Sequence, residues 1–217
     1  MKVKDLGWIL ILIGISLFIF LPITNPIFVS LTTRFPYLMG FMKTMILASM
    51  GEILVRRIKK GSYFGDPGFY LKAIVWGLLG MAFVFVFPLF DLGIRSILNN
   101  QMIFGNTFLN KLSYAFMVSL AMNVIFAPTF MMLHRVTDTY ILLSEGSLKK
   151  LRKISLNQVV DHIDFKFFFS FVIFKTIPLF WIPAHTITFM LPSTYRVLMA
   201  SYLSIALGIL LTLKKAK

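Results

Sequence analysis

Hydrophobic residues in this chain fall into long runs that carry almost no charge. Residues 6–33 contain no charged side chain. Such runs exceed the roughly 20 residues that an α-helix needs to cross about 30 Å of hydrocarbon. The pattern therefore predicts an all-α, polytopic membrane helix bundle. Its six hydrophobic segments are residues 6–23, 36–55, 73–90, 112–133, 167–190 and 197–213.

Basic residues fall mainly in every second gap between these segments. Sixteen of the 22 Lys and Arg residues lie in four clusters, at residues 2–4, 56–72, 135–166 and 214–217. Membrane proteins concentrate Lys and Arg in their cytoplasmic loops. The alternation therefore predicts an integral membrane protein that crosses six times and has both termini on the cytoplasmic side.

Composition agrees with this class and narrows the expected partners. The chain is 58% hydrophobic and only 14% charged, whereas a soluble domain has about 25% charged residues. A net charge of +14 could indicate nucleic-acid binding, but here the charge sits in loops beside the hydrophobic segments. We expect the bilayer and anionic lipid headgroups on the cytoplasmic side as partners, and no nucleic acid. A homo-oligomer is compatible with the sequence.

The N-terminus has a signal-peptide alternative. Two lysines precede an apolar core, but the core is long and no small-x-small cleavage site follows it. We therefore expect a retained helix at residues 6–23, added to a bundle at residues 36–213, within one transmembrane domain of residues 1–217. The extra helix, together with the lack of an Arg/Ser-rich transit segment, favours a prokaryotic plasma membrane over an organelle membrane.

The fifth hydrophobic segment is unusual. Lys175 lies in its middle, and Pro178 and Pro183 follow closely. One central Lys costs about 3 kcal/mol of insertion free energy, so the segment needs its neighbours to insert. We expect it to be broken or partly re-entrant, because irregular backbone at this depth is tolerated where protein or water surrounds it.

The polar, basic stretch at residues 134–165 precedes this segment. Its apolar residues are spaced as on one side of a helix, which predicts an amphipathic piece along the inner membrane surface. The residues concerned are Leu156, Val159, Val160 and Ile163.

Small and polar residues recur at every fourth position in three segments, and this spacing places each set on one helix face. One interpretation is close helix packing. The other is that parts of the stripes border an aqueous path, since polar groups at membrane depth face the bundle interior or water. The stripes are Gly40, Thr44, Ala48, Glu52 and Arg56, then Ala115, Ser119, Asn123 and Ala127, then Arg196, Ala200, Ser204 and Gly208.

Glu52 and Lys175 are the costliest residues to place in a membrane. Glu52 has Arg56 four residues on, which favours a local ion pair. The alternative is that Glu52 and Lys175 approach inside the bundle and set ion selectivity. The candidate pore-lining or intramembrane polar residues are Glu52, Lys175, Asn123, Ser119, Tyr195, Arg196 and Ser204.

Catalytic and metal-binding motifs are missing from the sequence. His134 and Asp138 are four residues apart, but two ligands without a third are weak evidence for a metal, and a salt bridge at a helix end is the expectation. His162 and His185 have no visible partner. The chain lacks cysteine and the common nucleophile, Walker and zinc-protease motifs. We therefore predict no enzyme activity, no metal and no cofactor.

Three motifs resemble a known family. Trp181-Ile182-Pro183 is followed by Pro192, Tyr195 and Arg196, which looks like the family block that ends in P-x-x-Y-R. Ala48–Leu54 is similar to a small-residue stretch that ends in G-D, with Glu52 in place of Asp, and Phe126-Ala127-Pro128 matches an F-A-P motif. These residues resemble the Mpv-seventeen and twenty-two-kilodalton peroxisomal membrane protein family. Met122-Asn123 replaces the family's D-Q pair.

The resemblance implies an all-helical membrane protein, and some members of the family form weakly selective pores for small solutes. It also implies that Glu52, Pro192, Tyr195 and Arg196 stand at family positions. From the residues alone, Arg196 either pairs with an acid such as Asp91 or faces a solute. We predict a channel-like protein for small solutes or ions, anions among them. The alternative is a non-conducting membrane scaffold or assembly protein.

Overall fold

The fold is a bundle of membrane-length helices. The computed structural model describes residues 3–99 and 107–213, and every regular element in those ranges is helical. Six helical runs there are long and apolar enough to cross a membrane, as the hydrophobic pattern predicts. They are α1 (Val3–Phe20), α3 (Pro36–Lys60), α4 (Phe69–Asn99), α5 (Phe108–Ile125), the run Phe165–Met190 and α11 (Ser193–Leu213).

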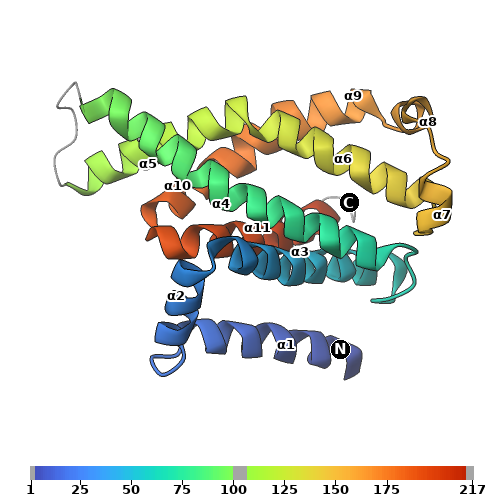
Figure 1. The fold of residues 1–217 in the computed structure, drawn as a ribbon, viewed down its shortest axis with the longest axis horizontal. Helices are drawn as coiled ribbons and strands as arrows, with labels where there is room; N and C mark the ends of the chain where they lie inside the picture. The colour runs from blue at the N-terminus through green and yellow to red at the C-terminus, as the bar shows by residue number, and fades with distance from the viewer. Residues whose placement is uncertain (1–2, 100–106, 214–217) are drawn as a thin grey trace.

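Successive runs cross the bundle in alternating directions, so that both described ends of the chain lie at one end of it (Figure 1). The same end carries the loops at residues 61–68 and 144–164 with the predicted basic clusters, and we call it the basic end. The helix α2 (Asn25–Arg34) lies at the opposite end, the far end. Lys2, Lys214, Lys215 and Lys217 complete the predicted clusters but lie outside the described residues.

The helix α3 packs against both α4 and α11 through small residues. A Cβ atom on Gly80 of α4 would collide with the backbone oxygen of Gly40 and with Thr44, both on α3. On the other side of α3, a Cβ on Gly51 would lie 3.2 Å from Cα of Ile205 of α11. The packing interpretation therefore holds at Gly40 of the first stripe. Gly51 and Gly80 lie outside the predicted stripes but pack in the same way, because only glycine allows so close an approach.

Two features end α3 at the basic end. Gly61 adopts a left-handed conformation with φ 77°, and its N–H bonds to the carbonyl of Arg57, which closes the last turn. Arg57, Lys59 and Lys60 lie in that turn, where cations complement the helix dipole. The loop that follows brings the chain back into α4.

The first helix lies along the outside of the bundle (Figure 1). Asp5 of α1 forms an ion pair with Arg57 of α3, at 2.7 Å, and Ser16 shares a hydrogen bond of 2.7 Å with Tyr202 of α11. Most apolar side chains of α1 face outward. The helix α2 starts at Asn25-Pro26, and proline is well placed there because a first-turn residue needs no N–H partner.

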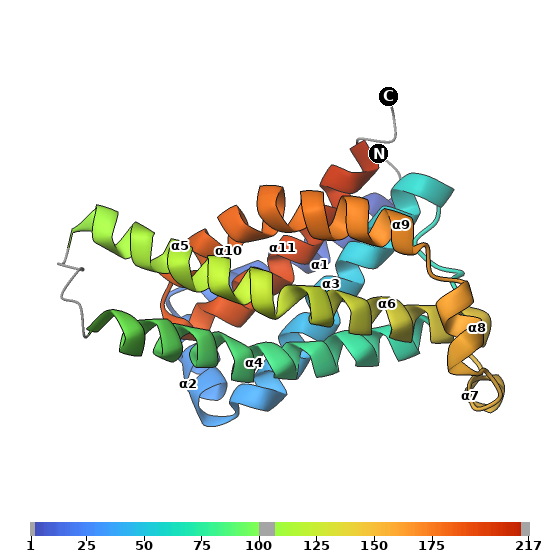
Figure 2. The same cartoon turned by 90° about the horizontal axis from the view of Figure 1, so that it is seen from above.

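The stretch at residues 134–165 differs from the prediction. Residues 134–143 continue the fourth segment as part of α6 (Ala127–Leu143), which follows α5 after a short break at Phe126 (Figure 2). Only α7 (Leu148–Leu151) and α8 (Leu156–Asp161) cross the basic end. Val159 and Ile163 are buried against the bundle, whereas Leu156 and Val160 are exposed. The amphipathic piece predicted around Leu156, Val159, Val160 and Ile163 thus corresponds to α8, but two of these four residues pack against protein.

The fifth segment is irregular, as expected, but it is not interrupted. The chain stays helical from Phe165 to Met190 through α9 (Phe165–Phe167), a π-helix η1 (Phe168–Trp181) and α10 (Ile182–Met190). Within η1, the hydroxyl of Thr176 donates to the carbonyl of Phe171, five residues back, in keeping with π geometry. Wider backbone spacing, rather than a chain break, accommodates Pro178 and Lys175.

Buried apolar side chains of the described residues form three clusters, the smallest of which joins α6, η1 and α10 around Ala127, Ile177 and Ile182. One cluster joins α4, α5, α10 and α11 around Phe87, Val118 and Phe189. A second joins α1, α2, α3 and α11 around Phe28, Leu47 and Leu198. The space between α3, α4, α6, η1 and α11 toward the basic end is not filled in this way, and it holds the candidate site.

Candidate functional site

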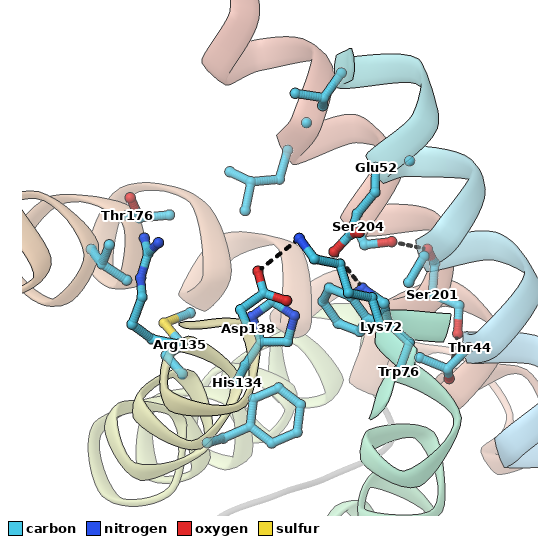
Figure 3. A pocket seen from close by; sticks show the side chains of 18 of the residues that line it. Thr44, Glu52, Lys72, Trp76, His134, Arg135, Asp138, Thr176, Ser201 and Ser204 are labelled. Carbon is cyan, nitrogen blue, oxygen red and sulfur yellow. Dashed lines mark hydrogen bonds and ion pairs between the residues drawn. The ribbon is translucent and has the colours of Figure 1, made fainter. Parts of the chain in front are cut away.

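A cavity of about 560 Å³ lies inside the bundle, and α3, α4, α6, η1 and α11 contribute to its walls (Figure 3). Exposed side chains of Lys59 and Lys60 border it, so it opens toward the basic end. Its remaining polar lining comes from Thr44, Glu52, Arg56, Asp66, Lys72, His134, Arg135, Asp138, Thr176, Ser201 and Ser204. A charged cavity within membrane-length helices is expensive to build, which points to a functional site.

A network of ion pairs forms the mouth of the cavity. Asp66 lies 3.0 Å from Nε of Arg56 and 3.2 Å from Nζ of Lys60. Burial raises the pKa of Asp66, but the hydrogen bond from Lys60 and the charges of Arg56 and Lys60 outweigh burial and leave this pKa below its ordinary value. Asp66 therefore keeps its negative charge near neutral pH.

Two carboxylate side chains and one imidazole lie close together in the cavity. His134 and Asp138 come from one face of α6, and Glu52 reaches them from α3 (Figure 3). The ligand atoms of the three side chains all lie within 4.8 Å of one another. We call Glu52, His134 and Asp138 the carboxylate–histidine cluster.

Two residues of α4 hold this cluster in place. Nε1 of Trp76 donates a 2.8 Å hydrogen bond to Oε1 of Glu52, and the Trp76 ring lies 4.3 Å from that of His134 between centroids. Nζ of Lys72 lies 3.6 Å from Oδ2 of Asp138. Lys72 and Trp76 are four residues apart, so one face of α4 supplies both contacts.

The deepest wall of the cavity is polar but uncharged. The hydroxyls of Thr44 and Ser201 share a 2.9 Å hydrogen bond between α3 and α11, and Ser204 donates to the carbonyl of Ser201 at 2.7 Å. Trp181 of η1 also lines the cavity and stacks on His185, with 5.1 Å between the ring centroids. The indole ring therefore separates the cavity from the residues around His185.

Ser119 and Asn123, predicted candidates, lie in that separate region. Both are buried, and the Asn123 side-chain amide contacts Nδ1 of His185 at 3.1 Å. The hydroxyl of Ser119 donates to the carbonyl of Ile182 at 2.7 Å. These contacts join α5 to α10, so the two residues pack helices and do not line the cavity.

The two predictions for Glu52 are wrong. Arg56 pairs with Asp66 rather than with Glu52, because the loop after α3 folds back over the helix end. Lys175 is exposed on the outside of η1 and does not line the cavity, so it cannot meet Glu52 there. The cation that lies near Glu52 is Lys72. The salt bridge expected at His134 and Asp138 joins Asp138 to Lys72 of another helix.

Tyr195 and Arg196 lie at the far end and do not line the cavity. The hydroxyl of Tyr195 accepts a 2.7 Å hydrogen bond from Nδ2 of Asn25. Arg196 forms the expected ion pair with Asp91, at 3.0 Å between Nη1 and Oδ2. Of the predicted candidates, Glu52 and Ser204 line the cavity.

Sequence reasoning missed Lys72 and Trp76 as site residues. Lys72 falls in a basic loop cluster by its place in the sequence, although it lies one turn inside α4. The four-residue spacing of a lysine and a tryptophan at the start of an apolar helix was the available signal.

Comparisons with known proteins give no relative to set beside this site. No protein-family model matches the chain, and no curated protein or solved structure is significantly similar to it. The resemblance to the Mpv-seventeen family, which depends on short motifs, therefore stays a prediction.

Proposed function

We propose that this protein binds small solutes in the cavity and lets them cross the membrane, with anions preferred over cations. The observation that carries the proposal is the 560 Å³ cavity, which opens at the basic end and is lined by charged side chains within membrane-length helices. Such side chains in membrane proteins mark solute and ion pathways. A volume in this range suits a small organic molecule or a hydrated ion.

The preference for anions follows from the lining charges. Five basic side chains line the cavity against three acidic ones. Low-dielectric walls strengthen the field of such an excess and raise the local concentration of anions. The basic residues concerned are Arg56, Lys59, Lys60, Lys72 and Arg135.

The proposed path is gated rather than permanently open. Among the described residues, none of the polar groups at the far end, including Asp91, Tyr195 and Arg196, lines the cavity. Trp181 of η1 lines the cavity and stacks on His185, which does not line it. Transport would therefore require movement near η1, and π-helical segments often occur at functional sites.

A scaffold or assembly role is the second candidate. The contacts of Gly40 with Gly80 and of Gly51 with Ile205 favour it, because close helix packing of this kind is what a scaffold needs. A scaffold, however, gives no reason for charged groups in a cavity at membrane depth. An enzyme would need a reacting set of residues, and we propose none.

The proposed setting is a prokaryotic plasma membrane, with the basic end toward the cytoplasm and in contact with anionic headgroups. The motifs that resemble the Mpv-seventeen family support two parts of the proposal: a location in a lipid bilayer and the permeation of small solutes. Assembly into a homo-oligomer is compatible with the exposed apolar surface of the bundle.

Flux through proteoliposomes that contain the purified protein tests the proposal. Iodide entry and potassium entry are measured in parallel, and we expect protein-dependent entry with iodide favoured. Ser204→Trp places a bulky ring in the cavity and should reduce the iodide flux at least about tenfold, since it blocks the binding space.

Leu210→Trp is the matched control, because it adds the same ring to an exposed position of the same helix, α11. Its flux should equal that of the unmodified protein. Permeation is ruled out if the unmodified protein conducts neither ion and also fails to release a trapped small organic anion. Equal flux through both tryptophan variants would show that the cavity is not the path.

A further inference from the structure

The carboxylate–histidine cluster has the composition and spacing of a metal site. We propose that Glu52, His134 and Asp138 bind one divalent transition-metal ion inside the cavity. The proposal concerns binding alone and does not depend on permeation. His134 and Asp138 could be recognised as a pair in the sequence, and the third ligand, Glu52, comes from a helix about 80 residues earlier in the chain.

The distances are close to those that an ion requires. The three ligand atoms lie within 4.8 Å of one another. Around a tetrahedral ion with bonds of 2.0 to 2.2 Å, ligand atoms lie about 3.4 Å apart. Side-chain rotations that move each atom by about 1 Å would close the site, and the helices that carry them need not move.

An unused hydrogen-bonding atom points to an ion. Within the described residues, Oδ1 of Asp138 is buried and has no hydrogen-bond partner. Buried polar atoms in a native protein are usually satisfied, so this oxygen suggests a ligand. Trp76 holds only Oε1 of Glu52 and fixes the orientation of that carboxylate.

At the carboxylate–histidine cluster itself the charge balance favours a divalent cation, although basic side chains outnumber acidic ones over the whole cavity. Among the described residues, Lys72 is the ammonium group beside the two carboxylates of the cluster, and Arg56 is engaged by Asp66 at the mouth. An unbalanced carboxylate in a low-dielectric interior is costly. Lys72 has a long stem and a side chain that is 21% exposed, so it can withdraw toward the mouth when an ion binds.

The ligand set narrows the choice of metal. One imidazole and two carboxylates, without any thiolate, suit Zn²⁺, Co²⁺, Fe²⁺ or Mn²⁺ rather than Cu⁺, and an imidazole is unusual for Ca²⁺ or Mg²⁺. Three protein ligands leave at least one position open, and here it would face the cavity. That position could hold water or an anion, in agreement with the excess of basic residues around it.

Metal binding by detergent-purified protein without an affinity tag tests the proposal. Co²⁺ is titrated and its visible absorption recorded, and Zn²⁺ is titrated in competition with a chromogenic chelator. We expect one equivalent to bind with a tetrahedral or five-coordinate Co²⁺ spectrum. His134→Asn and Asp138→Asn should each weaken binding at least about tenfold, since each removes a ligand.

Two further variants distinguish a metal site from a structural charge network. Lys72→Met removes the competing cation and should tighten Zn²⁺ binding at least about tenfold. His162→Asn changes an exposed histidine of the α8 region and should leave binding unchanged. The proposal fails if neither the unmodified protein nor Lys72→Met binds stoichiometrically, in which case the cluster serves structure alone. It also fails if His134→Asn and His162→Asn bind equally well.

Discussion

An ion pair with little water contact joins Arg196 and Asp91 at the far end. The two side chains are only 12% and 15% exposed, and Tyr114 donates a second bond to Asp91. Asp91→Asn leaves the guanidinium without its counter-charge, so we expect the free energy of unfolding to fall by about 3 kcal/mol. Equilibrium unfolding in mixed micelles measures the change.

The exposed pair of Glu145 and Lys150 provides the control for this prediction. Both of its side chains are more than half exposed, at 67% and 59%. Solvent screens such pairs, so Glu145→Gln should leave the unfolding free energy almost unchanged. Similar losses in the two variants would mean that burial does not strengthen the Arg196 pair.

At the level of single residues, the sequence predicted an ion pair correctly where the order of the spans alone places both residues at the same end of the bundle. Arg196 and Asp91 lie at the same end by topology, and so their pairing could be predicted. It failed for Glu52 because the partner depends on which faces of α3, α4 and α6 meet, and hydropathy does not contain that information. It failed for Lys175 because π geometry changes the face on which each residue lies.

Close contact between α3 and α4 depends on glycine at one position. A methyl group on Gly80 would collide with the backbone of Gly40 and the side chain of Thr44. We therefore expect Gly80→Ala to lower the unfolding free energy by about 2 kcal/mol, because the helices must separate. The same micelle assay measures it, and the Thr44–Ser201 bond beside the cavity would be disturbed as well.

Gly93 lies in the same helix with no atom within 4 Å of the position a Cβ would take. Gly93→Ala is therefore a matched control, and it should be neutral or slightly stabilising because alanine is the better helix former. If Gly93→Ala proved as damaging as Gly80→Ala, helix propensity rather than packing would explain the loss.

At the level of elements, the hydrophobic pattern predicted the existence of the spans better than their ends. The helix α4 continues to Asn99, beyond the predicted end at residue 90, and α6 extends the fourth segment to Leu143. Both extensions are partly polar, so hydropathy alone gives no reason to include them. Pro178 and Lys175 signalled irregularity in the fifth span, but a proline pattern does not distinguish a break from a π-helix.

The cavity is a property of the whole molecule and could not be predicted from the chain. Its walls come from five helices, and its chemistry depends on contacts between residues far apart in sequence, such as Glu52 with Trp76 and Asp138 with Lys72. The polar members of the stripes indicated that some faces border water. Which members do so depends on how the five helices pack, and hydropathy does not contain that information.

The alternation of basic clusters predicts the orientation of the whole molecule. The chain contains no cysteine, so single-cysteine variants report one position each. Lys149→Cys lies at the basic end and Thr33→Cys at the far end, and both positions are exposed. In intact cells, a membrane-impermeant maleimide should label Thr33→Cys but not Lys149→Cys, because Lys and Arg are retained in the cytoplasm during insertion. After permeabilisation both should react, which verifies that each cysteine is accessible.

Labelling of Lys149→Cys alone in intact cells would show the opposite orientation, with the cavity open to the outside.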